Sequence, residues 1–84
     1  MSAPYRIDLT AEDMLTIGFV GARYAWSEVL IDLGEGEHEL GEAEAWRIAE
    51  ACNADTEGGH AVFPMLAPES ELFAKLLAFR DGII

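Results

Sequence analysis

The chain has 84 residues, of which 16 are acidic and 5 are basic, so its formal net charge is −11 at pH 7. A chain of this length is expected to form one domain over residues 1–84, and its hydrophobic content of 51% is too high for an intrinsically disordered protein. The strongly negative field excludes direct binding to the phosphates of DNA or RNA and adsorption to an anionic membrane surface.

Residues 1–9 are expected to form an extended N-terminal arm. Within it, Tyr5, Ile7 and Leu9 alternate with polar side chains, which is the period of a half-buried strand. An extended tail that packs on helices has the same pattern, so the sequence leaves both interpretations open.

A long helix is predicted over residues 11–33. Thr10 is a good N-cap, and Asp13 stands three residues later, as in a capping box. Apolar side chains recur at three- and four-residue steps and predict one buried face, made of Leu15, Phe19, Ala22, Trp26, Val29 and Leu33. Gly18 and Gly21 leave the alternative of a kink that splits this helix in two.

Two further helices are predicted after an acidic loop at 34–41. The helix over 42–54 has a narrow apolar face with Trp46 beside it, made of Ala45, Ile48, Ala49 and Cys52. The helix over 69–81 begins near Pro68 and has a broad apolar face. Between them, the apolar segment 60–67 is interrupted by Pro64, which indicates a buried connector or a short edge strand.

These elements predict an all-α fold, a compact three-helix antiparallel bundle with an extended N-terminal arm. Its expected core contains Leu15, Phe19, Trp26, Leu30, Leu72 and Leu76. The alternative is a small α+β fold in which residues 5–9 pair with 61–63 in a two-stranded sheet. A core this small, without a disulfide, would gain stability from a permanent partner or from a homodimer.

The charge distribution is the most informative feature for function. Ten acidic residues and only one basic residue, Arg47, lie between Glu28 and Glu57, so this window holds nine of the eleven net negative charges. Such a surface either keeps a small protein soluble or docks on a basic partner. Trp46 lies among these carboxylates as a candidate anchor. The expected partner-binding residues are Glu28, Asp32, Glu35, Glu37, Glu39, Glu42, Glu44 and Trp46.

Other chemistry finds little support in the sequence. Residues 53–64 resemble a calcium loop at first, but Pro64 stands where the bidentate Glu belongs. Cys52 is the single cysteine, which excludes an internal disulfide, and with His38 and His60 it lacks the spacing of a zinc site. Cys52 is expected to be buried and inert. No nucleophile motif or phosphate loop is present, so we expect no metal, no cofactor and no enzymatic activity.

In size, acidity and lack of a catalytic motif, the chain resembles the small inhibitors encoded by phages and mobile elements, including anti-CRISPR proteins and DNA mimics. The resemblance lies in the composition of the whole chain and in the acidic window 28–57, and it carries over no family site residues. It implies a non-enzymatic inhibitor that binds and occludes a basic protein surface, one that otherwise holds nucleic acid.

Two alternatives remain open at this point. The chain is either a structural or adaptor module that binds through its apolar 60–66 region, or an antitoxin-like neutraliser of a basic toxin. The N-terminus lacks the pattern of a signal peptide, and no stretch reaches the roughly 18 apolar residues of a membrane span. We therefore expect a protein of a reducing cytoplasm, that of the host cell if a phage encodes it.

Overall fold

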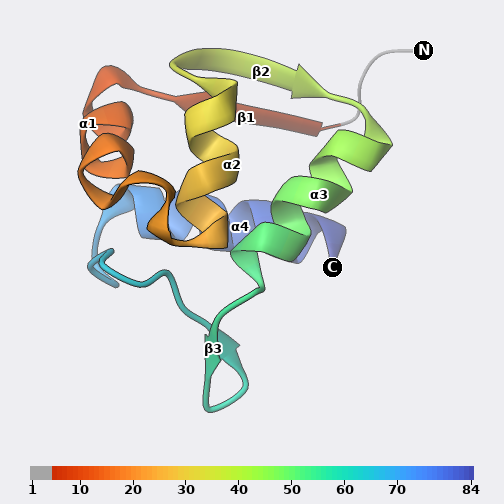
Figure 1. Ribbon diagram of the computed structural model, residues 1–84. Helices are drawn as coiled ribbons and strands as arrows, with labels where there is room; N and C mark the ends of the chain where they lie inside the picture. Colours follow the sequence, from red (N-terminus) through yellow and green to blue (C-terminus); the bar gives the residue numbers. More distant parts are fainter. Residues whose placement is uncertain (1–4) are drawn as a thin grey trace.

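Four α-helices, a 3-10 turn and two short antiparallel ribbons make up residues 5–84, the part of the chain that the computed structural model describes (Figure 1). The elements in chain order are β1 (Tyr5–Leu9), α1 (Ala11–Val20), η1 (Gly21–Arg23), α2 (Ala25–Leu33), β2 (Gly36–Leu40), α3 (Glu42–Cys52), β3 (Thr56–Glu57), β4 (His60–Ala61) and α4 (Glu71–Ile83). The fold is therefore α+β, and the predicted all-α three-helix bundle is wrong. Residues 1–4 of the expected arm lie outside the described residues.

The first ribbon joins β1 to β2, so the predicted acidic loop at 34–41 is largely a strand. The two strands run antiparallel, with Ile7 opposite His38 and Leu9 opposite Gly36. Ile7, Leu9 and Leu40 are buried, whereas the charged side chains that alternate with them on the two strands are exposed. The strand interpretation of residues 5–9 is confirmed, but their partner is 36–40 and not the 61–63 of the predicted α+β alternative.

The predicted helix over 11–33 is two α-helices separated by a 3-10 turn. Thr10 and Asp13 form the predicted capping box, with Thr10 Oγ1 3.1 Å from the Asp13 amide nitrogen and Asp13 Oδ2 3.0 Å from the Thr10 amide nitrogen. Gly21 then ends α1 at a φ of 71°, a left-handed conformation that favours glycine. The kink alternative is thus the correct one.

The break at Gly21 changes which side of α1 is buried. Ile17 and Val20 are in the core, whereas Leu15 and Phe19 are each 76% exposed. The predicted burial of Leu15 and Phe19 is therefore wrong. They would share one apolar face with the residues of α2 only if residues 11–33 formed a single straight helix. With α1 and α2 packed against each other as separate helices, Ile17 and Val20 set the buried face of α1 instead.

The core lies between the ribbon and the helices. Trp26, Leu30, Leu72 and Leu76 are buried in it, as predicted. Phe63 packs edge-on against Trp26 and Phe73, with ring centroids 5.9 and 4.9 Å apart. The apolar segment after β4 therefore fills the end of the core.

The last two helices agree closely with the sequence. Helix α3 covers 42–52 of the predicted 42–54, and its predicted apolar face is buried. Helix α4 covers 71–83 and not the predicted 69–81; it starts at Glu71, because Ser70 Oγ accepts a hydrogen bond of 3.1 Å from the Phe73 amide. Between them, Gly58 and Gly59 turn the β3–β4 hairpin at positive φ. Within residues 5–84, no helix has the length and hydropathy that a transmembrane span requires.

Candidate functional site

The outer face of the β1–β2 ribbon carries a small group of charged side chains. Arg6 and Asp8 alternate outward on β1, opposite Glu39 and Glu37 on β2. Arg6 lies 2.8 Å from Glu39 Oε1 and 3.5 Å from Glu37 Oε1. All three side chains are mostly exposed, so each pair contributes about 0–1 kcal/mol and leaves the carboxylates accessible to a partner.

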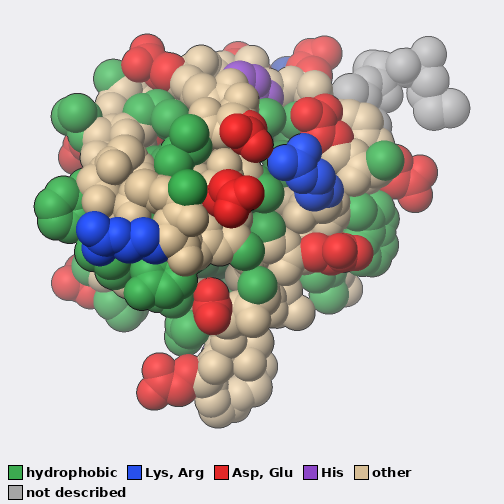
Figure 2. Space-filling model, in the orientation of Figure 1, with side chains coloured by type: hydrophobic (Ala, Val, Ile, Leu, Met, Phe, Trp, Pro, Cys, Tyr) green, Lys and Arg blue, Asp and Glu red, His purple; other side chains and the backbone are tan. Residues whose placement is uncertain are grey.

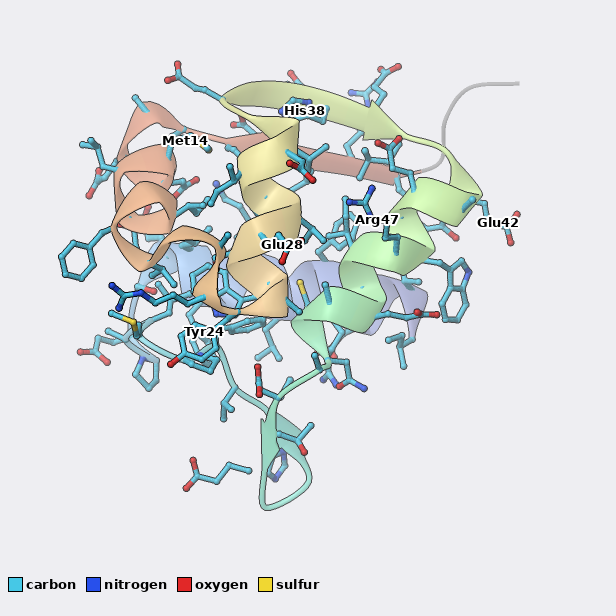
Figure 3. All side chains as sticks on the ribbon, viewed as in Figure 1. Met14, Tyr24, Glu28, His38, Glu42 and Arg47 are labelled. Carbon is cyan, nitrogen blue, oxygen red and sulfur yellow. The ribbon has the colours of Figure 1, made fainter. Side chains whose placement is uncertain are left out.

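A second group of carboxylates follows the exposed side of α2. Glu28 and Asp32 lie one helical turn apart on this side, and Glu35 follows the end of the helix; all three are exposed. Arg47 on α3 approaches Asp32, with 3.5 Å between Nη2 and Oδ2. Figure 3 shows Glu28 and Arg47 on adjacent helices on the same side of the molecule. The space-filling view of this side shows acidic side chains around few basic ones (Figure 2).

Helix α3 adds a tryptophan between carboxylates. Its buried face, which includes Ala45 and Ile48, packs into the core and directs the opposite side to solvent. Trp46 is 41% exposed, and Glu42 and Glu50 stand one turn before and one turn after it. An exposed indole with an acidic rim is suited to pack on the aliphatic part of an Arg or Lys side chain and on its charge.

The structure thus exposes all eight predicted partner-binding residues. Seven lie on α2, β2 and α3, and Glu35 lies between α2 and β2; α2 and α3 are in contact. We call this set the acidic surface; it comprises Glu28, Asp32, Glu35, Glu37, Glu39, Glu42, Glu44 and Trp46. Arg6 could not be predicted as a cation of this surface from the sequence. It comes next to Glu37 and Glu39 only because β1 pairs with β2.

The cations of the chain leave this surface strongly negative. All five basic residues lie in the described range, and only Arg6 and Arg47 form ion pairs with its carboxylates. Lys75 lies 2.5 Å from Asp13 Oδ2, and Arg80 is held by Asn53 and Asp81. Arg23 has no carboxylate within 4 Å among residues 5–84 and is 3.7 Å from the sulfur of Met65.

Cys52 and His38, the residues considered for thiol or metal chemistry, are not exposed as the residues of the acidic surface are. Cys52 is buried, and burial raises the pKa of its thiol to about 12, although the charge of Arg80 opposes this shift. His38 faces inward on β2, where Nε2 lies 2.9 Å from the Gly34 carbonyl oxygen. Within residues 5–84, no group of three or more His, Cys, Asp and Glu side chains has the arrangement of a metal site.

A cavity that the sequence did not predict lies between α1 and the start of α4. Its volume is about 430 Å³, and its lining includes Thr16, Met65, Ser70 and the Asp13–Lys75 ion pair. None of the eight residues of the acidic surface lines it.

Comparison with known proteins finds no family model, no curated relative and no solved structure that matches the chain.

Proposed function

We propose that the chain is a non-enzymatic inhibitor that covers a basic, nucleic-acid-binding surface of another protein. The observation that carries this proposal is the exposure of all seven predicted carboxylates, on α2, β2 and α3 and, for Glu35, between α2 and β2, with only two of the guanidinium groups within residues 5–84 paired to them. Carboxylates fixed on rigid elements can take the place of phosphates toward Arg and Lys, and docking releases counterions as DNA binding does.

Trp46 gives the proposed interface an apolar anchor. An isolated exposed ion pair contributes at most about 1 kcal/mol, so charge alone favours fast but short-lived binding. An indole that becomes fully covered adds buried area and slows dissociation. The proposed partner therefore presents a basic groove with an apolar or arginine-lined position for Trp46.

The alternative of an adaptor that binds through residues 60–66 receives less support. Ala61, Phe63 and Leu66 are all buried, so this segment offers a partner mainly Met65. An antitoxin-like neutraliser would use the same acidic surface as the proposed inhibitor. The identity of the captured protein separates these two functions.

The test is capture from a nuclease-treated lysate of the source cell at increasing salt. We expect the captured protein to bind nucleic acid, to be released by rising salt and to be displaced by duplex DNA. Glu28→Lys with Glu44→Lys should reduce capture by about tenfold or more, since two contacts of up to about 1 kcal/mol become repulsive.

The matched control reverses two other exposed carboxylates, Glu69 and Glu71, to lysine. This variant changes the net charge by the same amount and also places a lysine in the first turn of a helix, but it leaves the acidic surface intact. It should capture the partner like the wild type. Equal loss in both variants, or a partner that remains bound at high salt, contradicts the proposed function.

A further inference from the structure

Strand β1 has one edge that no other strand pairs with. Within residues 5–84 its sheet has two strands, so β2 lies on one side of β1 and no strand lies on the other (Figure 1). Lys75 on α4 donates a hydrogen bond of 2.6 Å to the Asp8 carbonyl oxygen, so the main-chain groups of Asp8 point away from β2. Because the direction of these groups alternates along a strand, those of Arg6 point away from β2 as well. Arg6 and Asp8 therefore form the free edge of β1.

Most hydrogen-bonding groups of this edge have no partner in the described part of the chain. The Asp8 carbonyl accepts from Lys75, but the Asp8 amide and both main-chain groups of Arg6 make no hydrogen bond outside the ribbon. A cavity of about 380 Å³ opens beside the edge, and it is lined by Arg6, Ile7, Asp8, Lys75, Ala78 and Phe79. Unpaired main-chain groups beside open space are suited to accept an added strand.

The charged side chains of β1 indicate what the added strand should carry. Arg6 and Asp8 are both exposed on the outer face of the ribbon. Arg6 pairs with Glu37 and Glu39, whereas Asp8 stands opposite Glu37 and forms no ion pair within residues 5–84. A strand with a cation opposite Asp8 and an anion opposite Arg6 would complement this edge.

We propose that the added strand is β1 of a second copy, in an antiparallel, two-fold symmetric pair centred on Ile7. This register places Arg6 of each copy opposite Asp8 of the other, because both residues lie one position from the axis. Their main-chain groups then bond to each other, and the second lone pair of the Asp8 carbonyl lets it keep Lys75. Registers centred on Arg6 or on Asp8 would place like charges opposite each other, so the charges select the register centred on Ile7.

The other edge of the ribbon is not suited to the same pairing. Glu37 and Glu39 stand opposite Asp8 and Arg6, so their main-chain groups form the outer edge of β2. Two β2 strands would bring only carboxylates together, so the association closes at two copies with the strand order β2–β1–β1–β2. One short strand buries less than the roughly 800 Å² per partner of a standard interface, and the net charge of each copy opposes association. We therefore expect a weak, reversible dimer at micromolar or higher concentration, independent of the proposed inhibitory function.

Sedimentation equilibrium of the whole chain, from about 10 µM to about 1 mM, tests for this dimer. The average mass should rise from 9.2 kDa toward twice that value. Phe19→Ser, which changes a side chain of α1 that is 76% exposed, should associate like the wild type. A chain that stays monomeric at the highest concentration, a mass that grows beyond two copies, or loss of association in Phe19→Ser overturns the proposal.

Amide hydrogen exchange, followed by NMR at both ends of this concentration range, locates the pairing. The Arg6 and Asp8 amides should exchange quickly in the monomer. Their exchange should slow by about tenfold once about 90% of the chains are paired, because only unpaired chains then exchange freely. The Glu37 and Glu39 amides on the outer edge of β2 are the matched control and should not change. Protection of the β2 amides instead, or of neither pair, overturns the proposal.

A charge swap tests the register. Asp8→Arg should weaken the dimer by about tenfold, because it places two arginines opposite each other on both sides of the axis. Glu69→Arg changes the net charge equally at an exposed position outside the ribbon and should not weaken it. The double variant Arg6→Asp with Asp8→Arg should recover most of the wild-type association, while far-UV circular dichroism shows that all variants keep their helices. A double variant that fails to recover association, or Asp8→Arg that dimerises like the wild type, overturns the pairing centred on Ile7.

Discussion

We predict that Lys75 makes the main polar interactions between α4 and the N-terminal half of the chain. Its ammonium group lies 2.5 Å from Asp13 Oδ2 and 2.6 Å from the Asp8 carbonyl oxygen. It therefore links α4 to the end of β1 and to the capping box of α1. Lys75→Met keeps most of the aliphatic length of the side chain and removes both interactions.

The expected loss of stability follows from the burial of this pair. Two hydrogen bonds from a charged donor contribute about 1.5 kcal/mol each, or about 3 kcal/mol together. The side chain of Asp13 is only 11% exposed and is left without its counter-ion, whereas Lys75 is 29% exposed and partly hydrated. We expect the free energy of unfolding to fall by about 2–3 kcal/mol.

The effect should depend on pH in a defined direction. Burial raises the pKa of Asp13, but hydrogen bonds from Lys75 and Thr10 lower it by more, so it lies below its ordinary value of 3.8. The stability from this pair is therefore fully present above about pH 4 and is lost as the pH falls through the lowered pKa. The difference between wild type and Lys75→Met should shrink over the same range.

Urea unfolding followed by circular dichroism at several pH values measures this difference. Arg47→Met is the control, because its ion pair with Asp32 is 3.5 Å long and exposed and should contribute less than about 1 kcal/mol. If Lys75→Met unfolds within about 0.5 kcal/mol of wild type at neutral pH, or if the difference does not shrink as the pH falls below the ordinary range of an Asp carboxyl, Lys75 does not have the stabilising role inferred here.

Three further predictions concern stability and reactivity. Leu76→Ala, at a fully buried position, should lower the free energy of unfolding by about 2–5 kcal/mol, whereas Leu15→Ala should change it by less than about 0.5 kcal/mol. Equal effects of the two substitutions in urea unfolding would contradict the burial of Leu76 and the exposure of Leu15. Gly18→Ala should raise the free energy of unfolding by up to about 1 kcal/mol in urea unfolding, and a decrease would contradict the open space beside Gly18. Cys52 should react with a thiol reagent at neutral pH only after unfolding, and rapid labelling of the native chain would contradict its raised pKa.

Local patterns predicted much of this fold. The capping box at Thr10 and the apolar face of α3 could be read from the sequence because neighbours a few residues apart determine them. The exposed carboxylates could be predicted for the same reason, since charge strongly favours the surface. The burial of Cys52 followed from its place beside Ile48 and Ala49.

Features that depend on distant residues could not be predicted in this way. The alternation of β2 was hidden by its composition, because Glu37 and Glu39 face solvent while only Leu40 is a buried apolar residue, and pairing with β1 supplies the missing stability. The side of α1 that is buried depends on the break at Gly21. The sequence of α1 has two possible apolar faces, one with Leu15 and Phe19 and one with Ile17 and Val20, and only the second is buried. Pairing of Arg6 with Glu39 required the same long-range strand register.

The central proposal is that the acidic surface docks on a basic protein in place of nucleic acid. The slope of the logarithm of the binding constant against the logarithm of salt concentration, measured with the captured partner, tests it most directly. Wild type and Glu69→Lys with Glu71→Lys should share a steep negative slope. Glu28→Lys with Glu44→Lys should bind about tenfold or more weakly with a shallower slope, because fewer counterions are released. Binding that is insensitive to salt and unchanged in the Glu28 and Glu44 variant would contradict the proposal.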